Sequence, residues 1–259
     1  MATIVTGEMY QKVDGQLFEL KRQIRQPNGY PFDPQLLSAG LQELIEGCFG
    51  SRQQQQVTTH PSFKVSETNL SEAIKQAEKF AKKILGVAGG LDLKKKFGFP
   101  EDLPWQNVMV IYDPGTLNNR DAVQKAIKDQ GIDEWEETDV MNYSGSEATG
   151  QPTLHIIENS LRPSLDTMNK SPDMLMETGR IWLTLRRYAL AFGLRYLVLK
   201  DYLDPETWTW CPNNRLPSGD VARGGWRPYS SQVKFFRSSS SFRCSGVGAR
   251  SAIPVPLAP

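Results

Sequence analysis

The chain has 259 residues, of which 39% are hydrophobic and 23% are charged, and its formal net charge at pH 7 is +1. This composition is typical of a soluble globular protein with one large or two small domains. A net charge so close to zero argues against a general polyanion binder, because phosphate binding relies on many lysines and arginines, so we expect no nucleic-acid partner.

The sequence predicts neither an export signal nor a membrane span. The first residues lack the basic region and apolar stretch of a secretory signal. The most apolar run, 188–199, contains Arg195 and is too short to span a bilayer. We therefore expect a cytoplasmic protein.

The cysteines and histidines predict no metal site. Cys48, Cys211 and Cys244 form no CxxC pair, and His60 and His155 lie far apart in the sequence. This spacing fits neither a disulfide framework nor a zinc site. We expect no metal and no other cofactor.

The N-terminal region predicts a helical hairpin. In residues 8–26, apolar side chains recur at spacings of three and four, and a Pro-Asn-Gly turn ends this helix. A second helix begins at Asp33 and Pro34, a capping residue followed by a proline suited to the first turn. We expect residues 1–49 to form a first domain, which either joins subunits or a partner through residues 8–46 or packs on the rest of the chain.

Residues 50–69, which include a run of glutamines, are expected to be a linker to a main domain over residues 70–259. The first half of this domain predicts, in chain order, a helix over 70–86, a strand over 107–113, a helix over 121–131, an acidic run over 133–139 that starts a helix, and a strand over 153–158.

The second half predicts one long helix followed by short strands. The helix is expected over 172–192, ending at Gly193. Ile181 and Leu185 lie on its apolar face, with Arg186 outside that face. Short strands are expected over 194–203, 206–212, 221–226, 232–236 and 248–255. Because helices cluster early and short, mostly antiparallel strands cluster late, we expect an α+β fold.

Few groups predict catalysis. His155 lies in an apolar strand with no Ser or Cys nearby in the sequence and is expected to be structural. The turn 114–119, between a strand and a helix, is where a phosphate loop would lie. It has no GxGxxG, GKS or GKT motif, and Asp113 and Asp121 beside it would repel phosphate. A nucleotide-binding regulatory module centred on this turn stays a minor alternative.

The segment 222–255 has ends like ordered sequence and a middle that follows no helical or strand period. It begins with Arg223, two glycines and Trp226 and closes with the run 248-GARSA-252. This arrangement resembles the C-terminal C-type-lectin-like (formylglycine-generating-enzyme-like) domain of variable proteins in diversity-generating retroelements. The segment 206–220 looks like a constant part of that fold. The chain is also similar to uncharacterised proteins of candidate-phyla bacteria.

The resemblance implies a non-enzymatic ligand-binding protein whose surface over about residues 222–247 is diversified. In that family, mutation at the adenines of Asn codons yields Ser, Arg, Tyr, Phe, Cys, Gly or Val, and 237–248 contains only such residues. Aromatic, arginine and serine side chains suit contact with a macromolecule, which we expect to be a protein. The candidate ligand contacts are Arg223, Trp226, Arg227, Tyr229, Ser230, Ser231, Phe236, Arg237, Ser238, Ser240, Phe242, Arg243 and Ser245.

Other residues of the same segment are expected to be constant. Gln232 and Lys234, like Trp226, lie outside the set that adenine mutation of Asn codons reaches. Val233 and Phe235 alternate with their neighbours as inward strand residues do. We therefore expect these positions to be constant.

A second interpretation of the resemblance is an enzyme, similar to the sulfatase-activating oxidases that share this architecture. It requires the thiols of Cys211 and Cys244 to converge on one site. Thiols act as ligands or nucleophiles when a basic or metal environment ionises them, and nothing near these two cysteines in the sequence demands one.

Overall fold

The structure is a computed structural model that describes residue 14 and residues 63–137, 139–142 and 149–258. Backbone contacts divide the chain into two units, Met1–Gly50 and Ser51–Pro259. The expected hairpin over 1–49 and most of the expected linker over 50–69 lie outside the described residues.

A three-stranded antiparallel sheet forms one half of this unit. Its order is β10-β5-β3, from Ala252–Val255, Thr153–Glu158 and Val108–Asp113. Every residue of β3 is buried, because helix α3 (Leu70–Lys83) covers one face and helix α7 (Leu185–Leu199) the other. Apolar runs of this kind are typical of strands covered on both faces. The strands predicted over 107–113 and 153–158 are confirmed, as is the helix that begins at residue 70.

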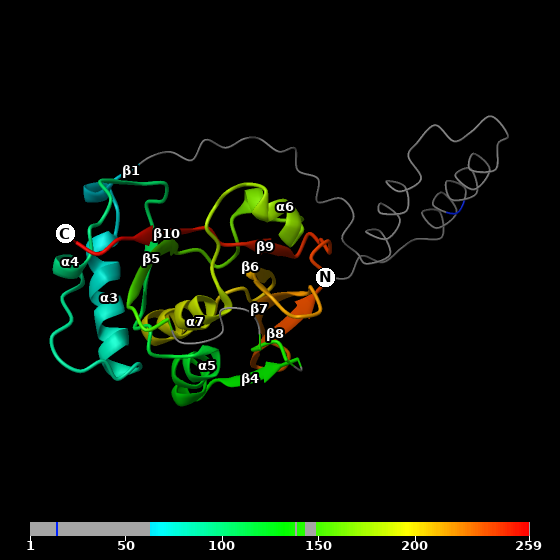
Figure 1. Ribbon diagram of the computed structural model, residues 1–259, viewed down its shortest axis with the longest axis horizontal. Coiled ribbons are helices and arrows are strands. Elements are labelled where there is room, and N and C mark those ends of the chain that lie inside the picture. The colour runs from blue at the N-terminus through cyan, green and yellow to red at the C-terminus, as the bar shows by residue number, and fades with distance from the viewer. Residues whose placement is uncertain (1–13, 15–62, 138, 143–148, 259) are drawn as a thin grey trace. The chain divides into compact units, whose positions relative to one another are not determined.

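A five-stranded sheet forms the other half. Its order is β4-β8-β7-β6-β9, in which β4 pairs with β8 and β6 with β9 in parallel and the other pairs are antiparallel. The strands are Asp133–Glu136 (β4), Gln232–Ser238 (β8), Val221–Arg227 (β7), Trp208–Arg215 (β6) and Val247–Ala249 (β9). Figure 1 shows α7 between the two sheets, and the chain from β9 to β10 runs from one sheet into the other.

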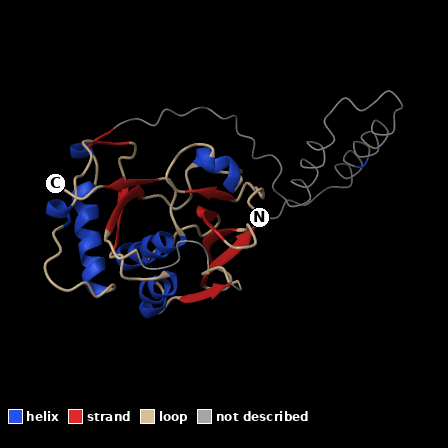
Figure 2. Cartoon of the chain, viewed as in Figure 1, coloured by secondary structure: helices blue, strands red, loops and turns tan. Residues whose placement is uncertain are grey.

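The remaining elements are short. They are β1 (Phe63–Lys64), η1 (Val65–Glu67), α4 (Leu93–Lys96), β2 (Asp102–Leu103), α5 (Asn119–Ala126), η2 (Lys128–Gln130), η3 (Leu165–Thr167) and α6 (Pro172–Met176). The first two fall at the end of the expected linker, which is therefore structured there. Helices and mostly antiparallel strands, coloured separately in Figure 2, occur together as expected of an α+β protein. None of the helices in the described ranges is long and apolar enough to cross a membrane.

The acidic run over 133–139 does not start a helix as expected, because it forms the edge strand β4. Its backbone pairs with β8, about a hundred residues further along the chain. Glu134 and Glu136 are matched by Lys128 at 3.7 Å and Arg120 at 2.8 Å. Pairing with a distant strand is information that a local pattern does not contain.

The helix predicted over 172–192 is interrupted. α6 covers only Pro172–Met176, and α7 begins at Leu185. Trp182 lies between them, fully buried, and its indole donates a hydrogen bond at 3.2 Å to a backbone carbonyl of α6. Because the chain leaves the helical path there, Ile181, expected on the apolar face, is 45% exposed.

Helix α7 runs past Gly193 to Leu199, so the strand predicted over 194–203 is wrong. Gly193 was expected to end the helix because glycine often follows a last helical turn. Here it lies at a helix crossing, where a Cβ would lie 2.1 Å from the carbonyl oxygen of Ala126 in α5. The missing side chain lets the two helices approach closely.

Candidate ligand-binding face

Alternation along β7 and β8 gives the five-stranded sheet two different faces. On the inner face, Val233 and Phe235 are fully buried and pack in the same cluster as Tyr188 of α7. The expectation that both point inward is confirmed. The opposite side, here called the outer face, is made by the outward side chains of the sheet: Trp135, Trp208, Trp210, Arg223, Arg227, Lys234 and Phe236. Trp210 and Arg227 are buried on this side, and the other five are at least partly exposed.

The glycines at the ends of the unpatterned segment are required by close packing. A Cβ at Gly224 would lie 2.5 Å from the Tyr188 ring, and one at Gly225 would lie 2.8 Å from the Thr207 carbonyl oxygen. At Gly248 a Cβ would lie 2.6 Å from the sulfur of Met168. Both end motifs are therefore parts of the core, as expected of constant sequence.

A buried ion pair fixes the closing end of the segment. Arg250 Nη2 lies 2.7 Å from Asp204 Oδ1, and the two side chains are only 3% and 0% exposed. Thr209 of β6 donates to the second Asp204 oxygen at 2.7 Å and accepts from Arg250 Nε at 3.2 Å. A buried pair of charges is tolerated when such hydrogen bonds complete it. Arg250 thus has a structural role.

The guanidinium of Arg223 lies among four aromatic rings on the outer face. Its central carbon is 5.0 Å from the ring centroid of Trp208, 5.5 Å from Trp210, 5.9 Å from Phe236 and 5.4 Å from Phe242. A cation within about 6 Å of a ring face is attracted by the ring quadrupole. The rings therefore hold this cation in one place between β6, β7 and β8.

Arg223 has no acceptor for its buried charge. Its Nε is buried without a hydrogen-bond partner, and Arg223 forms no ion pair within the described part of the chain. Burial, and to a lesser degree the neighbouring Arg227 cation, lowers the pKa of Arg223 to about 10, although Glu137 opposes the shift. Arg223 is still protonated at neutral pH, so it is a positive charge held in place without its counterion.

A second set of cations and rings continues across the outer face. The Arg227 guanidinium lies 3.6 Å from the Trp208 ring centroid. Lys234 Nζ lies 5.7 Å from the ring of Trp135 and 5.1 Å from the ring of Tyr229. The outer face is thus an alternation of positive groups and aromatic rings.

Several of the thirteen candidate contacts also have internal partners. Arg237 donates from its backbone N–H to Glu137 at 3.1 Å, and its side chain lies 3.5 Å from the same carboxylate. Ser240 donates to Asp173 at 2.7 Å, and Arg215 pairs with that carboxylate at the same distance. The hydrogen bond from Arg215 and, to a lesser degree, the one from Ser240 lower the pKa of Asp173. They anchor the loop after β8 to α6 and β6.

Two of the candidate contacts, which were predicted to lie at the surface, are buried instead. Trp226 is 6% exposed, because its side chain points to the inner face and stacks on Tyr202. Arg227 is 8% exposed, and its guanidinium donates to the Thr207 carbonyl oxygen at 3.1 Å. Tyr229 and Ser231 are exposed. The other nine are partly exposed: Arg223, Ser230, Phe236, Arg237, Ser238, Ser240, Phe242, Arg243 and Ser245.

The sequence did not point to three residues of the outer face. Trp135 lies in the acidic run and reaches this face only through the pairing of β4 with β8, and its ring centroid is 4.7 Å from that of Phe236. Trp208 and Trp210 share one face of β6, where they contact Arg223 and also pack in a buried cluster. The two-residue spacing of the tryptophans was the available signal.

The two cysteines of the oxidase interpretation do not converge. Cys211 is a fully buried free thiol on the inner face, whereas Cys244 packs with Trp210 and Val221 on the other side of the sheet. Burial, followed by the nearby Asp204 carboxylate, raises the pKa of Cys211 well above its ordinary value. This environment opposes formation of a thiolate.

The turn over 113–119 is filled by contacts of its own. Asp113 is fully buried and accepts from Arg186 Nε at 2.8 Å and from the Gly115 N–H at 2.9 Å. Arg186 also donates to the Leu117 carbonyl oxygen at 3.2 Å. Arg186 is therefore buried rather than outside the apolar face as expected. The Gly115 N–H that a phosphate loop would offer to a ligand is already used.

His155 lies in the core of the three-stranded sheet. It is 5% exposed, and burial, with a smaller contribution from Arg187, lowers its pKa to about 3. A histidine that stays neutral at physiological pH and lies away from the outer face is consistent with the structural role expected for it.

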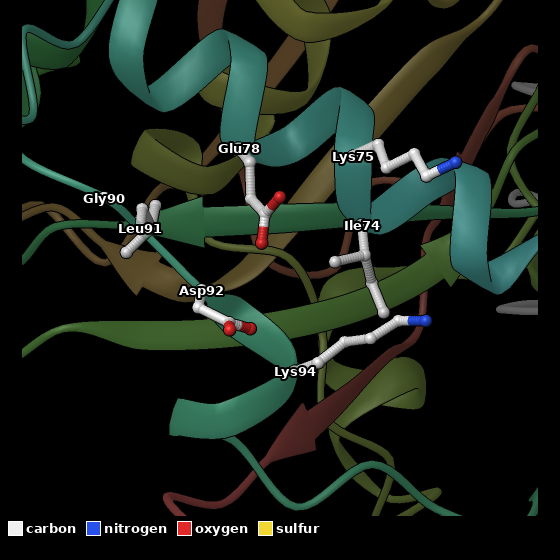
Figure 3. Close-up of a pocket in the computed structure, with 7 residues that line it drawn as sticks. All are labelled: Ile74, Lys75, Glu78, Gly90, Leu91, Asp92 and Lys94. Carbon is white, nitrogen blue, oxygen red and sulfur yellow. The ribbon is translucent and has the colours of Figure 1, made fainter.

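A shallow hollow lies on the other side of the unit, between α3 and residues 90–94 (Figure 3). Glu78 and Asp92 each accept a hydrogen bond from a backbone N–H of α4, at 2.9 and 3.2 Å. Lys94, which also lines the hollow, is exposed. With its acidic groups used in this way, the hollow offers less to a ligand than the outer face.

Comparison of the chain with protein-family models, with curated proteins and with solved structures finds no match. Among the described residues, no group of three or more His, Cys, Asp or Glu side chains is arranged to hold a metal ion.

Proposed function

We propose that this chain is a non-enzymatic ligand-binding protein whose contact surface is the outer face together with the 239–245 loop. On this proposal the region 70–259 is a C-type-lectin-like domain, and its surface over about residues 222–247 is diversified by a retroelement. The ligand is a macromolecule, for which a protein is the class that fits an aromatic and arginine-rich surface.

The alternation of inward and outward side chains along β8 is the observation that supports the proposal. The residue types Val, Phe and Ser are all reachable by adenine mutation of Asn codons, but Val233 and Phe235 are fully buried, whereas the outward Phe236 and Ser238 are partly exposed. A surface that accepts many sequences must contribute little to the stability of its scaffold. The outward positions of β8 are therefore those at which substitution would leave the core intact.

Substitution of outward residues tests this division. A variant with Tyr229, Ser231, Ser238 and Ser245 all changed to Ala removes no side-chain hydrogen bond within the described residues. We expect its free energy of unfolding in urea to stay within about 1 kcal/mol of the unchanged protein. Phe235→Ala, the inward control, should cost about 3–5 kcal/mol. Equal losses from the two variants would refute the proposal.

The neighbouring DNA tests the origin of the surface. We expect a near-identical repeat of the segment that encodes the C-terminal region, differing at adenines and lying near a reverse transcriptase gene. A genome without such a repeat would remove diversification from the proposal and leave only the binding surface.

A further inference from the structure

We infer that Arg223 anchors a carboxylate presented by a protein ligand on the outer face. This inference rests on the proposed function, since it names the chemistry of the group that the same surface receives. Three observations lead to it. They are the rings around Arg223, its missing counterion, and the acidic partners that Arg237 and Arg215 already have.

The rings give the Arg223 guanidinium a fixed orientation without neutralising it. Trp208, Trp210, Phe236 and Phe242 each lie within 6 Å of its central carbon. A guanidinium is planar and presents its N–H groups as a fixed fork that matches the two oxygens of a carboxylate. Aromatic walls displace water from such a contact, which strengthens its electrostatic component.

The charges around Arg223 leave a net positive centre. Arg227 adds a second cation, and Lys234 a third, on the same face of the sheet. The Glu137 carboxylate, which acts on Arg223 from a distance, is occupied by the backbone and side chain of Arg237. A buried, unpaired charge has a high desolvation cost, and a carboxylate from a ligand would offset this cost by forming an ion pair with it.

A single carboxylate fits this centre better than a chain of phosphates. Two other arginines of this region already have acidic partners: Arg237 lies 3.5 Å from Glu137, and Arg215 lies 2.7 Å from Asp173. A polyphosphate backbone that continued from this centre toward Arg237 or Arg215 would meet the Glu137 and Asp173 carboxylates, which repel it. An acidic side chain flanked by apolar groups satisfies both the cation and the rings.

The direct test uses the whole chain and a small probe. Titration with acetate, followed by the 15N–1H resonance of Arg223 Nε, should give a saturable shift that is stronger than the shift with chloride at the same ionic strength. An Nε resonance that does not respond to acetate would overturn the inference without any variant.

The second test selects peptides from a random display library on the immobilised full-length protein. We expect the selected peptides to be enriched in Asp or Glu at one position, and Arg223→Gln to weaken their binding about tenfold to a hundredfold. Lys94→Gln, on α4 and outside the outer face, removes the same charge and should leave binding unchanged. Arg223→Lys, which keeps the charge, should retain part of the acidic preference and covers the case in which Arg223→Gln fails to fold.

The outcomes separate this inference from the proposed function. Peptides that need Tyr229 and Phe236 but show no acidic preference and ignore Arg223→Gln would overturn the carboxylate anchor and leave the binding face intact. A library without any peptide that depends on these outer-face residues would overturn both. Binding of a single-stranded oligonucleotide that is lost with Arg223→Gln would replace the carboxylate with a phosphate and overturn the inference as well.

Discussion

Tyr202 and Trp226 stack with their ring centroids 3.8 Å apart and an interplanar angle of 5°. The stack lies on the inner side of β7, where Phe192 of α7 also contacts Trp226 at a centroid separation of 6.1 Å. An aromatic side chain held between two others in a core contributes through buried area and packing. Trp226 is thus a support of the sheet rather than a contact on its surface.

Trp226→Ala should lower the free energy of unfolding by about 3–5 kcal/mol, because it empties a large site in the core. Tyr229→Ala, three residues further along, removes a side chain that is 81% exposed and should change the free energy by no more than about 0.5 kcal/mol. Urea denaturation of both variants measures the difference. A mild effect of Trp226→Ala would place this tryptophan among the surface residues after all.

Gly224→Ala should destabilise the protein by about 1–3 kcal/mol, because the new methyl group would lie 2.5 Å from the Tyr188 ring. The matched control is Gly246→Ala, where no atom lies within 4 Å of the added Cβ. Its effect should be close to zero or slightly stabilising, since alanine restricts the unfolded chain. Thermal melting of the two variants side by side checks the contrast, which fails if both melt alike.

His155 should make the stability depend on pH below neutrality. Burial lowers its pKa to about 3, so between the ordinary value near 6.5 and that value the unfolded chain binds a proton that the folded chain does not. The free energy of unfolding is therefore unaffected by His155 above pH 6.5. It falls as the pH decreases from 6.5 toward 3, by up to about 1.4 kcal/mol per pH unit. In His155→Leu this slope should be reduced, as urea titrations at several pH values would reveal. An unchanged slope would mean that His155 is protonated in the folded protein.

Cys211 should be unreactive until the protein unfolds, because burial raises its pKa and excludes the reagent. Titration of thiols with a chromogenic disulfide should give the same count for the unchanged protein and Cys211→Ala under native conditions. In denaturant the two counts should differ by one thiol. A difference of one thiol before denaturation would restore Cys211 as a reactive group.

Local patterns predicted the elements whose identity is decided within a few residues. The buried run of β3, the apolar face of α3 and the alternation of Val233 with Phe235 were all readable from spacing. The same rules failed at Gly193 and at the acidic run of β4. Gly193 is required by the carbonyl oxygen of Ala126, and β4 by its pairing with β8, and both partners lie far away in the sequence.

The outer face shows the same limit. Arg223 and Phe236 were expected on it from their place in the unpatterned segment. Trp135 could not be expected there, because its position depends on a parallel pairing across about a hundred residues. Nor does the sequence show that Arg237 and Ser240 have internal partners, since Glu137 and Asp173 come from other elements. Spacing indicates which residues can face outward, and only tertiary structure shows which of them are free to be replaced.

The alternation of inward and outward side chains along β8 also constrains the DNA that encodes it. Within this strand, only every second codon can change without removing a core side chain. In the loop over 239–245 that follows, the Ser240 hydroxyl donates a hydrogen bond to Asp173, and Phe242 and Cys244 pack against a buried cluster, so these positions are constrained as well. A template that rewrites this segment while keeping the protein folded would therefore place its mutable adenines in alternate codons along the strand.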